Sequence, residues 1–62
     1  MSRYMVKIKN GQWTIPKENI VMLALVKAMD MKVQGVPIKN QEQAISFLES
    51  IGAEVSDYNE QL

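Results

Sequence analysis

Apolar residues recur at every second position in two short segments, at Tyr4, Val6 and Ile8 and again at Trp13 and Ile15, a period of two that is typical of β-strands. Asn10-Gly11 interrupts this alternation and favours a two-residue type I′ turn, which needs positive φ angles at both central positions. With this loop, the four apolar side chains of one face pair as Val6 with Ile15 and Ile8 with Trp13. A register slip of one residue would mix apolar and polar positions. The pattern therefore predicts an N-terminal β-hairpin.

Pro16 ends the second strand, because it has no amide proton for a ladder and its fixed φ suits the first turn of a helix. The apolar run from Ile20 onward predicts a long hydrophobic helix. Its end has two readings. In the first, the helix ends in a Schellman cap at Gly35. In the second, the helix ends near Met31 and residues 32–38 form extended chain. We prefer the end near Met31, because the apolar residues of 32–38 are β-branched and suit extended chain.

A second, shorter helix is predicted from Asn40 to the residue before Gly52. Asn40 is a favourable N-cap, Gln43 can return the bond in a capping box, and Gly52 suits the position after the helix. Its apolar residues gather on one side of a helical wheel: Ala44, Ile45, Phe47, Leu48 and Ile51. Residues 53–55 could add a short strand, and the polar residues 56–62 are expected to form a frayed tail.

The sequence thus predicts a single α+β domain over residues 1–55, with an N-terminal β-hairpin packed on a long hydrophobic helix and a shorter amphipathic helix. Residues 56–62 are assigned to the tail. The expected core consists of Val6, Ile8, Trp13, Ile15, Ile20, Ala24, Phe47, Leu48 and Ile51. With 62 residues there is room for one small core only.

The composition limits the kinds of catalytic and metal-binding site that the chain can form, because the chain has no His and no Cys. Disulfides, ordinary zinc sites, His-based acid–base catalysis and thiolate nucleophiles all need one of these residues. The carboxylates Glu42 and Glu49 fall on the exposed side of the second helix, and the glycines stand alone rather than in a phosphate-binding loop. We therefore expect a protein that is not an enzyme and has no cofactor, metal or small-molecule substrate.

The longest unbroken apolar stretch covers the seven residues 20–26, whereas a membrane-spanning helix needs ~20. No basic segment precedes a long apolar run at the N-terminus, so the sequence carries no secretory signal of the usual kind. These features, with the absence of Cys, predict a cytoplasmic protein that does not bind membranes.

Charge is unevenly distributed along the chain. All seven basic residues lie in 1–39, which has a net charge of +5, and residues 40–62 have a net charge of −5. An intramolecular match between the acidic second helix and the basic hairpin is one interpretation. The other is a nucleic-acid surface formed by Arg3, Lys7 and Lys9 on the polar face of the hairpin, since two-stranded ribbons can enter a DNA major groove. A net charge of zero, and a Trp placed on the core side, speak against it.

The first helix is apolar over about 240° of its circumference, more than the ~100° stripe that a surface helix needs. Methionines can simply fill gaps in a core, but such a helix must be covered on more than one side. The candidate contact surface consists of Met22, Leu25, Val26 and Met29. The expected function is that of a small interaction or regulatory protein, which binds itself as a homodimer and an unidentified protein partner. The alternative is a nucleic-acid-binding regulator.

Overall fold

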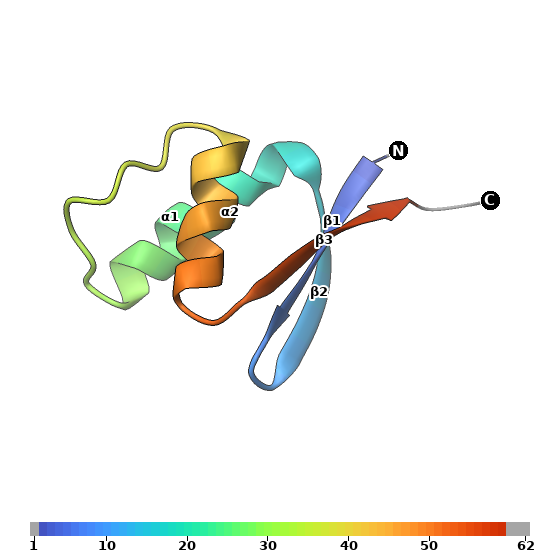
Figure 1. Ribbon diagram of the computed structural model, residues 1–62, viewed down its shortest axis with the longest axis horizontal. Coiled ribbons are helices and arrows are strands. Elements are labelled where there is room, and N and C mark those ends of the chain that lie inside the picture. The colour runs from blue at the N-terminus through green and yellow to red at the C-terminus, as the bar shows by residue number, and fades with distance from the viewer. Residues whose placement is uncertain (1, 60–62) are drawn as a thin grey trace.

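The computed structural model describes residues 2–59 and confirms the α+β class. Three antiparallel strands form a sheet of order β2-β1-β3 (Figure 1). The strands are β1 (Ser2–Ile8), β2 (Gly11–Pro16) and β3 (Glu54–Asn59). A short 3₁₀ helix, η1 (Lys17–Asn19), leads from β2 into the helices α1 (Ile20–Asp30) and α2 (Gln41–Ser50). The predicted hairpin, long helix and shorter helix are therefore all present.

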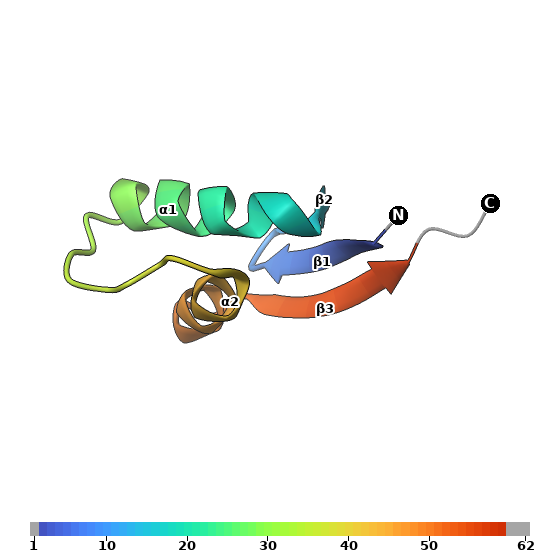
Figure 2. The ribbon, with the colours of Figure 1, turned by 90° about the horizontal axis from the view of Figure 1, so that it is seen from above.

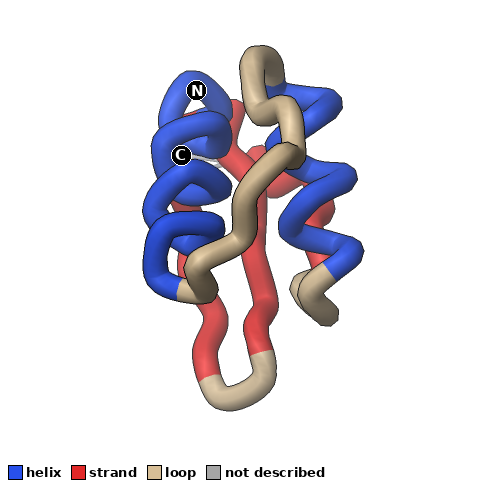
Figure 3. Tube along the Cα trace, turned by 90° about the vertical axis from the view of Figure 1, so that its left-hand side faces the viewer, coloured by secondary structure: helices blue, strands red, loops and turns tan. Residues whose placement is uncertain are grey.

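Both helices lie on the same side of the sheet, so the fold has two layers and the other sheet face is open (Figure 1). The connection between α1 and α2, residues 31–40, runs along the helices on the side away from the sheet (Figure 3). Ile38 of this connection is buried with the core residues. The core is thus bounded by the sheet on one side and by the connecting loop on the other.

The buried hydrophobic residues include five of those predicted, Val6, Ile20, Ala24, Phe47 and Leu48, and five others, Tyr4, Ala28, Ile38, Ala44 and Ala53. Three more predicted core residues, Ile8, Ile15 and Ile51, are partly buried against this cluster. The prediction was wrong for Trp13, whose side chain is 50% exposed. Trp13 lies directly opposite the buried Val6 but on the edge strand β2, at the border of the region that the helices cover.

The register of the hairpin also differs from the prediction. Val6 pairs with Trp13 and the loop residues are Lys9 and Asn10, whereas we predicted Ile8 opposite Trp13. The partner of Trp13 moves by two positions, which leaves every side chain on its predicted face, so the alternation alone does not distinguish the two registers. Lys9, not Gly11, takes a positive φ, of 32°.

Gly11 is needed for space rather than for a turn. A Cβ atom on Gly11 would lie 2.8 and 2.9 Å from Cζ2 and Cζ3 of the Trp13 ring, which packs over this glycine. Gly11 is accordingly a strand residue, paired with Ile8. The glycine that suggested a turn at Asn10-Gly11 instead accommodates the ring two positions further on.

Helix α1 ends at Asp30, which confirms the end near Met31. The residue that closes the helix is Lys32, with a positive φ of 56°. Its N–H donates to the Met29 carbonyl at 3.1 Å, and the Val33 N–H donates to the Ala28 carbonyl at 2.9 Å. These two bonds are those of a Schellman motif. A lysine therefore occupies the position that glycine usually takes.

Both predicted caps of α2 are confirmed. The Asn40 Oδ1 accepts a hydrogen bond from the Gln43 N–H at 2.8 Å, and Gly52, with φ of 97°, closes the helix in a second Schellman motif. The reciprocal bond differs by one position from a standard capping box. The Gln43 Oε1 accepts from the Lys39 N–H at 2.8 Å, so it satisfies the amide before the cap residue.

The C-terminal strand is longer than predicted. Strand β3 pairs with β1 through Val55 opposite Val6 and Asp57 opposite Tyr4, and it continues to Asn59. The prediction of a frayed tail was therefore wrong for residues 56–59, while residues 60–62 lie outside the described part of the chain. The residues of β3 are mostly polar, so the sequence gives only a weak indication of a strand. The strand forms because β1 is the central strand of the sheet, and β3 pairs with it over its whole length.

Candidate interaction surface

The inner side of α1 is a narrow stripe of buried residues four positions apart, Ile20, Ala24 and Ala28. This spacing keeps all three on one face of a helix. Two of them are alanines, whose small side chains allow close approach of the neighbouring elements. α1 thus needs only one apolar stripe to attach it to the fold.

The opposite side of α1 is apolar as well, although nothing in residues 2–59 covers it. Its side chains are Met22, Leu25, Val26 and Met29, which are 67%, 45%, 47% and 76% exposed. We call these four residues the outer face of α1. They are the four residues that the sequence singled out as a contact surface. Figure 2 shows α1 along one side of the molecule, with no other element beyond it.

Charged residues lie at the two ends of this face. Glu18, in η1, is exposed before the start of α1, and Lys32 is exposed just after its end. Asp30 is exposed at the last helical position, and Lys27 is half-buried on the flank that faces the hairpin, where it lines a pocket with Leu23 and Trp13. The outer face is therefore an apolar band with the negative Glu18 near one end and residues of both signs, Asp30 and Lys32, near the other.

The structure brings only part of the predicted basic surface together. Arg3 and Lys7 share the open face of the sheet, and Lys9 lies in the hairpin loop. Arg3 is half-buried and donates to the Thr14 carbonyl at 3.1 Å. Lys7 stands between Gln12 and Glu54 on the adjacent strands, so an acidic residue is its direct cross-strand neighbour. The open face is mixed in charge.

One aromatic residue on the open face was missed from the sequence. Tyr58, 37% exposed, is paired with Arg3 on the neighbouring strand and so lies on the same face. Alternation continued beyond Val55 would have placed Tyr58 there, but only if residues 56–59 had been recognised as strand.

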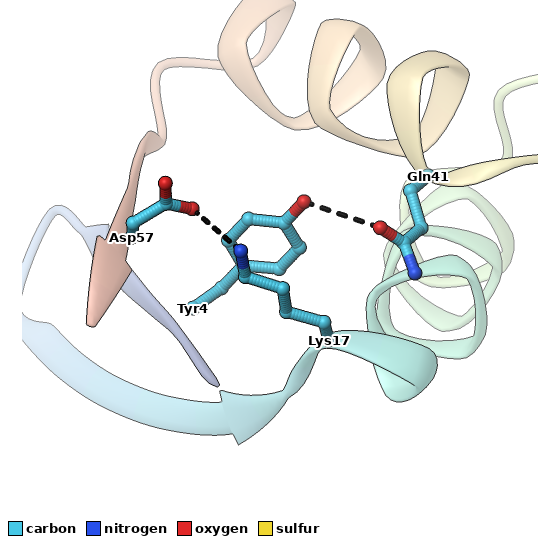
Figure 4. A network of polar contacts seen from close by, with 4 residues as sticks. All are labelled: Tyr4, Lys17, Gln41 and Asp57. Atoms are coloured by element: carbon cyan, nitrogen blue, oxygen red, sulfur yellow. Dashed lines mark hydrogen bonds and ion pairs between the residues drawn. The ribbon is translucent and has the colours of Figure 1, made fainter. Parts of the chain in front are cut away.

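The two oppositely charged halves of the chain meet in a small polar network (Figure 4). The Lys17 Nζ lies 3.0 Å from an Asp57 carboxylate oxygen and 4.9 Å from the centroid of the Tyr4 ring. The Tyr4 hydroxyl donates to the Gln41 Oε1 at 3.3 Å. Four elements are joined in this way, namely β1, η1, α2 and β3. The ion pair thus joins the two charged halves of the chain between η1 and β3, and not between the acidic helix and the hairpin as expected.

Three further findings concern membrane spans, metal sites and similar proteins. None of the helices in residues 2–59 has the length and hydropathy that crossing a bilayer requires. Within the same residues, no cluster of three or more carboxylate, imidazole or thiol side chains is arranged to hold a metal ion. No protein-family model, curated protein or solved structure matches the chain.

Proposed function

We propose that this chain is a non-enzymatic interaction protein that forms a homodimer through the outer face of α1 and regulates another protein by binding it. The observation that carries the proposal is the exposure of four apolar side chains on a helix that is already attached by its inner stripe. A surface helix needs one apolar stripe, and a second stripe on the opposite side costs solubility without adding to the core.

The outer face supplies part of the area that a contact between two copies needs. Together the four side chains expose on the order of 400 Å² per copy, about half of the ~800 Å² that each partner contributes to a standard interface. The charged residues at the ends supply surface for a polar rim, as at most interfaces. A two-fold dimer, in which the same face serves both copies, is the commonest closed assembly.

The test compares the association state of the wild-type chain with that of Met22→Lys/Met29→Lys by sedimentation equilibrium. Protein concentrations from about 1 to about 100 μM cover the common range of dimer dissociation constants. We expect a wild-type dimer and a folded, monomeric double variant, because both side chains are mostly exposed within one copy. Circular dichroism checks that the variant is folded. Glu49→Lys, a lysine on the exposed side of α2, is the matched control and should leave the dimer intact. A wild-type chain that stays monomeric throughout contradicts the proposal.

Nucleic-acid binding by the open sheet face is the second candidate, favoured by the placement of Tyr58 beside Arg3. An exposed ring next to a guanidinium is a common platform for an unpaired base. Its test is a mobility-shift assay with single- and double-stranded DNA at two salt concentrations, because phosphate contacts weaken steeply with salt. Binding that is lost in Lys7→Glu and in Tyr58→Ala would support this candidate. No binding at low salt would remove it.

A further inference from the structure

We infer that the two α1 helices of the dimer lie antiparallel, with the two-fold axis passing between Leu25 and Val26. The inference rests on the proposed dimer and specifies its orientation and register. It concerns a second copy of this chain, and it follows from two independent features, the spacing of the apolar residues on the outer face and the charges at its ends.

The spacing of the outer face is symmetric about its centre. Met22 and Met29 lie equally far from the midpoint between Leu25 and Val26, so reversing the helix maps each apolar position onto another. An antiparallel two-fold contact requires this property, because residue i of one copy meets residue j of the other and the reverse. In this register Met22 faces Met29 of the second copy, at both ends of the contact, and Leu25 faces Val26 at the axis.

The types of side chain suit these places. The smaller and more rigid residues lie at the centre, where the two helices approach most closely, and the two methionines lie further out. Methionine is unbranched and flexible, so it can fill the wider gaps where two helices diverge from their crossing point. The methionines are also the most exposed residues of the face, and an antiparallel pair covers both of them in each copy.

Glu18 and Lys32, at opposite ends of the outer face, favour the antiparallel orientation over the parallel one, and Asp30 at the same end as Lys32 reduces this preference. Glu18 lies before the start of α1 and Lys32 just after its end. In an antiparallel pair the start of one helix lies beside the end of the other, which brings Glu18 close to Lys32 of the second copy, twice by symmetry. A parallel pair would bring each charge beside its own kind. The helix dipoles likewise oppose each other favourably only when the helices are antiparallel.

Disulfide trapping tests the orientation directly, because the chain has no cysteine of its own. Met22→Cys and Met29→Cys are prepared separately, one with a short affinity tag, then mixed and oxidised. In the antiparallel register the two cysteines face each other, whereas like cysteines are separated by seven residues of helix rise, about 10 Å. A disulfide needs Cα atoms within ~7 Å. We therefore expect the mixed disulfide to exceed either homodisulfide by at least about tenfold.

Charge reversal tests the same register without a covalent bond. Glu18→Lys and Lys32→Glu should each raise the dissociation constant by about three- to tenfold at low salt, and the double variant should recover most of the wild-type value. Lys9→Glu, in the exposed hairpin loop, is the control for the change in net charge and should have no such effect. Two single variants whose effects simply add, without recovery in the double variant, would contradict the pairing.

The outcomes separate this inference from the proposal that it rests on. If the wild-type chain is a dimer but Met22→Cys and Met29→Cys yield homodisulfides and no mixed disulfide, the helices are parallel, which overturns the inference and leaves the homodimer standing. A dimer in which neither combination exceeds the background of a Glu49→Cys control has its contact elsewhere, which overturns both the inference and the role of the outer face. A monomeric wild-type chain overturns the homodimer itself.

Discussion

The two helices of this fold solve the same packing problem with different outer faces. Each attaches to the core by one buried stripe, which is Ile20, Ala24 and Ala28 in α1 and Ala44, Phe47 and Leu48 in α2. The exposed side of α2 carries polar residues, among them Glu42, Ser46 and Glu49. The exposed side of α1 carries the apolar outer face instead. Packing within one copy therefore explains α2 completely and α1 only in part.

This difference separates what folding requires from what it does not. α2 shows that a helix in this domain can be stable with a polar outer side, so the fold itself gives no reason for Met22 or Met29. A requirement outside the single chain is the remaining explanation, and covering by a second copy is the one that we propose. The comparison would fail if the outer face of α1 contributed as much to the stability of one copy as the buried stripe of α2.

The largest expected effect comes from shortening the same side chain in the two helices. Leu48→Ala removes a fully buried side chain and should lower the free energy of unfolding by about 3 kcal/mol. Leu25→Ala, made in the monomeric Met22→Lys/Met29→Lys background, should cost less than about 1 kcal/mol, because 45% of Leu25 is exposed. Urea unfolding followed by circular dichroism measures both. Equal costs would show that α1 is held by both of its sides, contrary to the comparison.

The ends of the helices allow a finer comparison, since both close in a Schellman motif but with different residues. Gly52→Ala should cost about 1–2 kcal/mol, because φ of 97° is strained for any residue with a Cβ atom. Steric contact does not contribute, since no atom lies within 4 Å of a Cβ atom placed there. Thermal unfolding should show the loss as a melting temperature lower by several degrees. An unchanged melting temperature would mean that the backbone at this position relaxes without cost.

Structural elements that depend on residues close together in the chain were predictable from the sequence. The N-cap at Asn40, the C-terminal glycine at Gly52 and the helical period of the apolar residues each act within a few positions, so they can be read without the rest of the fold. The strand β3 could not be read in this way. Its residues are mostly polar, and its pairing depends on β1, about fifty positions earlier in the chain.

Exposure of the outer face of α1 was predictable for a different reason. The helix has more apolar positions than a chain of this length can cover, which follows from the wheel and the length alone. The exposure of Trp13 was not predictable, because it depends on which strand is central in the sheet and on how much of the edge strand β2 the helices cover. The sequence alternation indicates which face of the sheet a residue occupies, but not how far across that face the helices extend.

The N-termini of the helices provide a matched pair with a smaller effect. Both have an asparagine at the cap position, but only Asn40 accepts a hydrogen bond from a backbone N–H of its helix. Asn40→Ala should therefore cost about 1 kcal/mol. Asn19→Ala should change stability by no more than a few tenths of a kcal/mol, since Asn19 has helical backbone angles after η1 and makes no capping bond. Urea unfolding of the two variants in parallel measures both changes in the free energy of unfolding. Similar losses of stability in the two variants would mean that Asn19 does cap α1.

The smallest expected effect is a gain of stability at the end of α1. Lys32 has a φ of 56°, which costs a residue with a Cβ atom strain that glycine avoids. Lys32→Gly should stabilise one copy by about 0.5 kcal/mol, because relief of this strain is partly offset by the greater freedom of glycine in the unfolded chain. The measurement belongs in the monomeric Met22→Lys/Met29→Lys background, where loss of the proposed contact with Glu18 of a second copy does not contribute. In the wild-type background the same substitution should weaken the dimer. If Lys32→Gly stabilises one copy but weakens the dimer, the lysine at this position serves association. If the substitution leaves the dimer unchanged, the role of Lys32 is limited to the end of the helix.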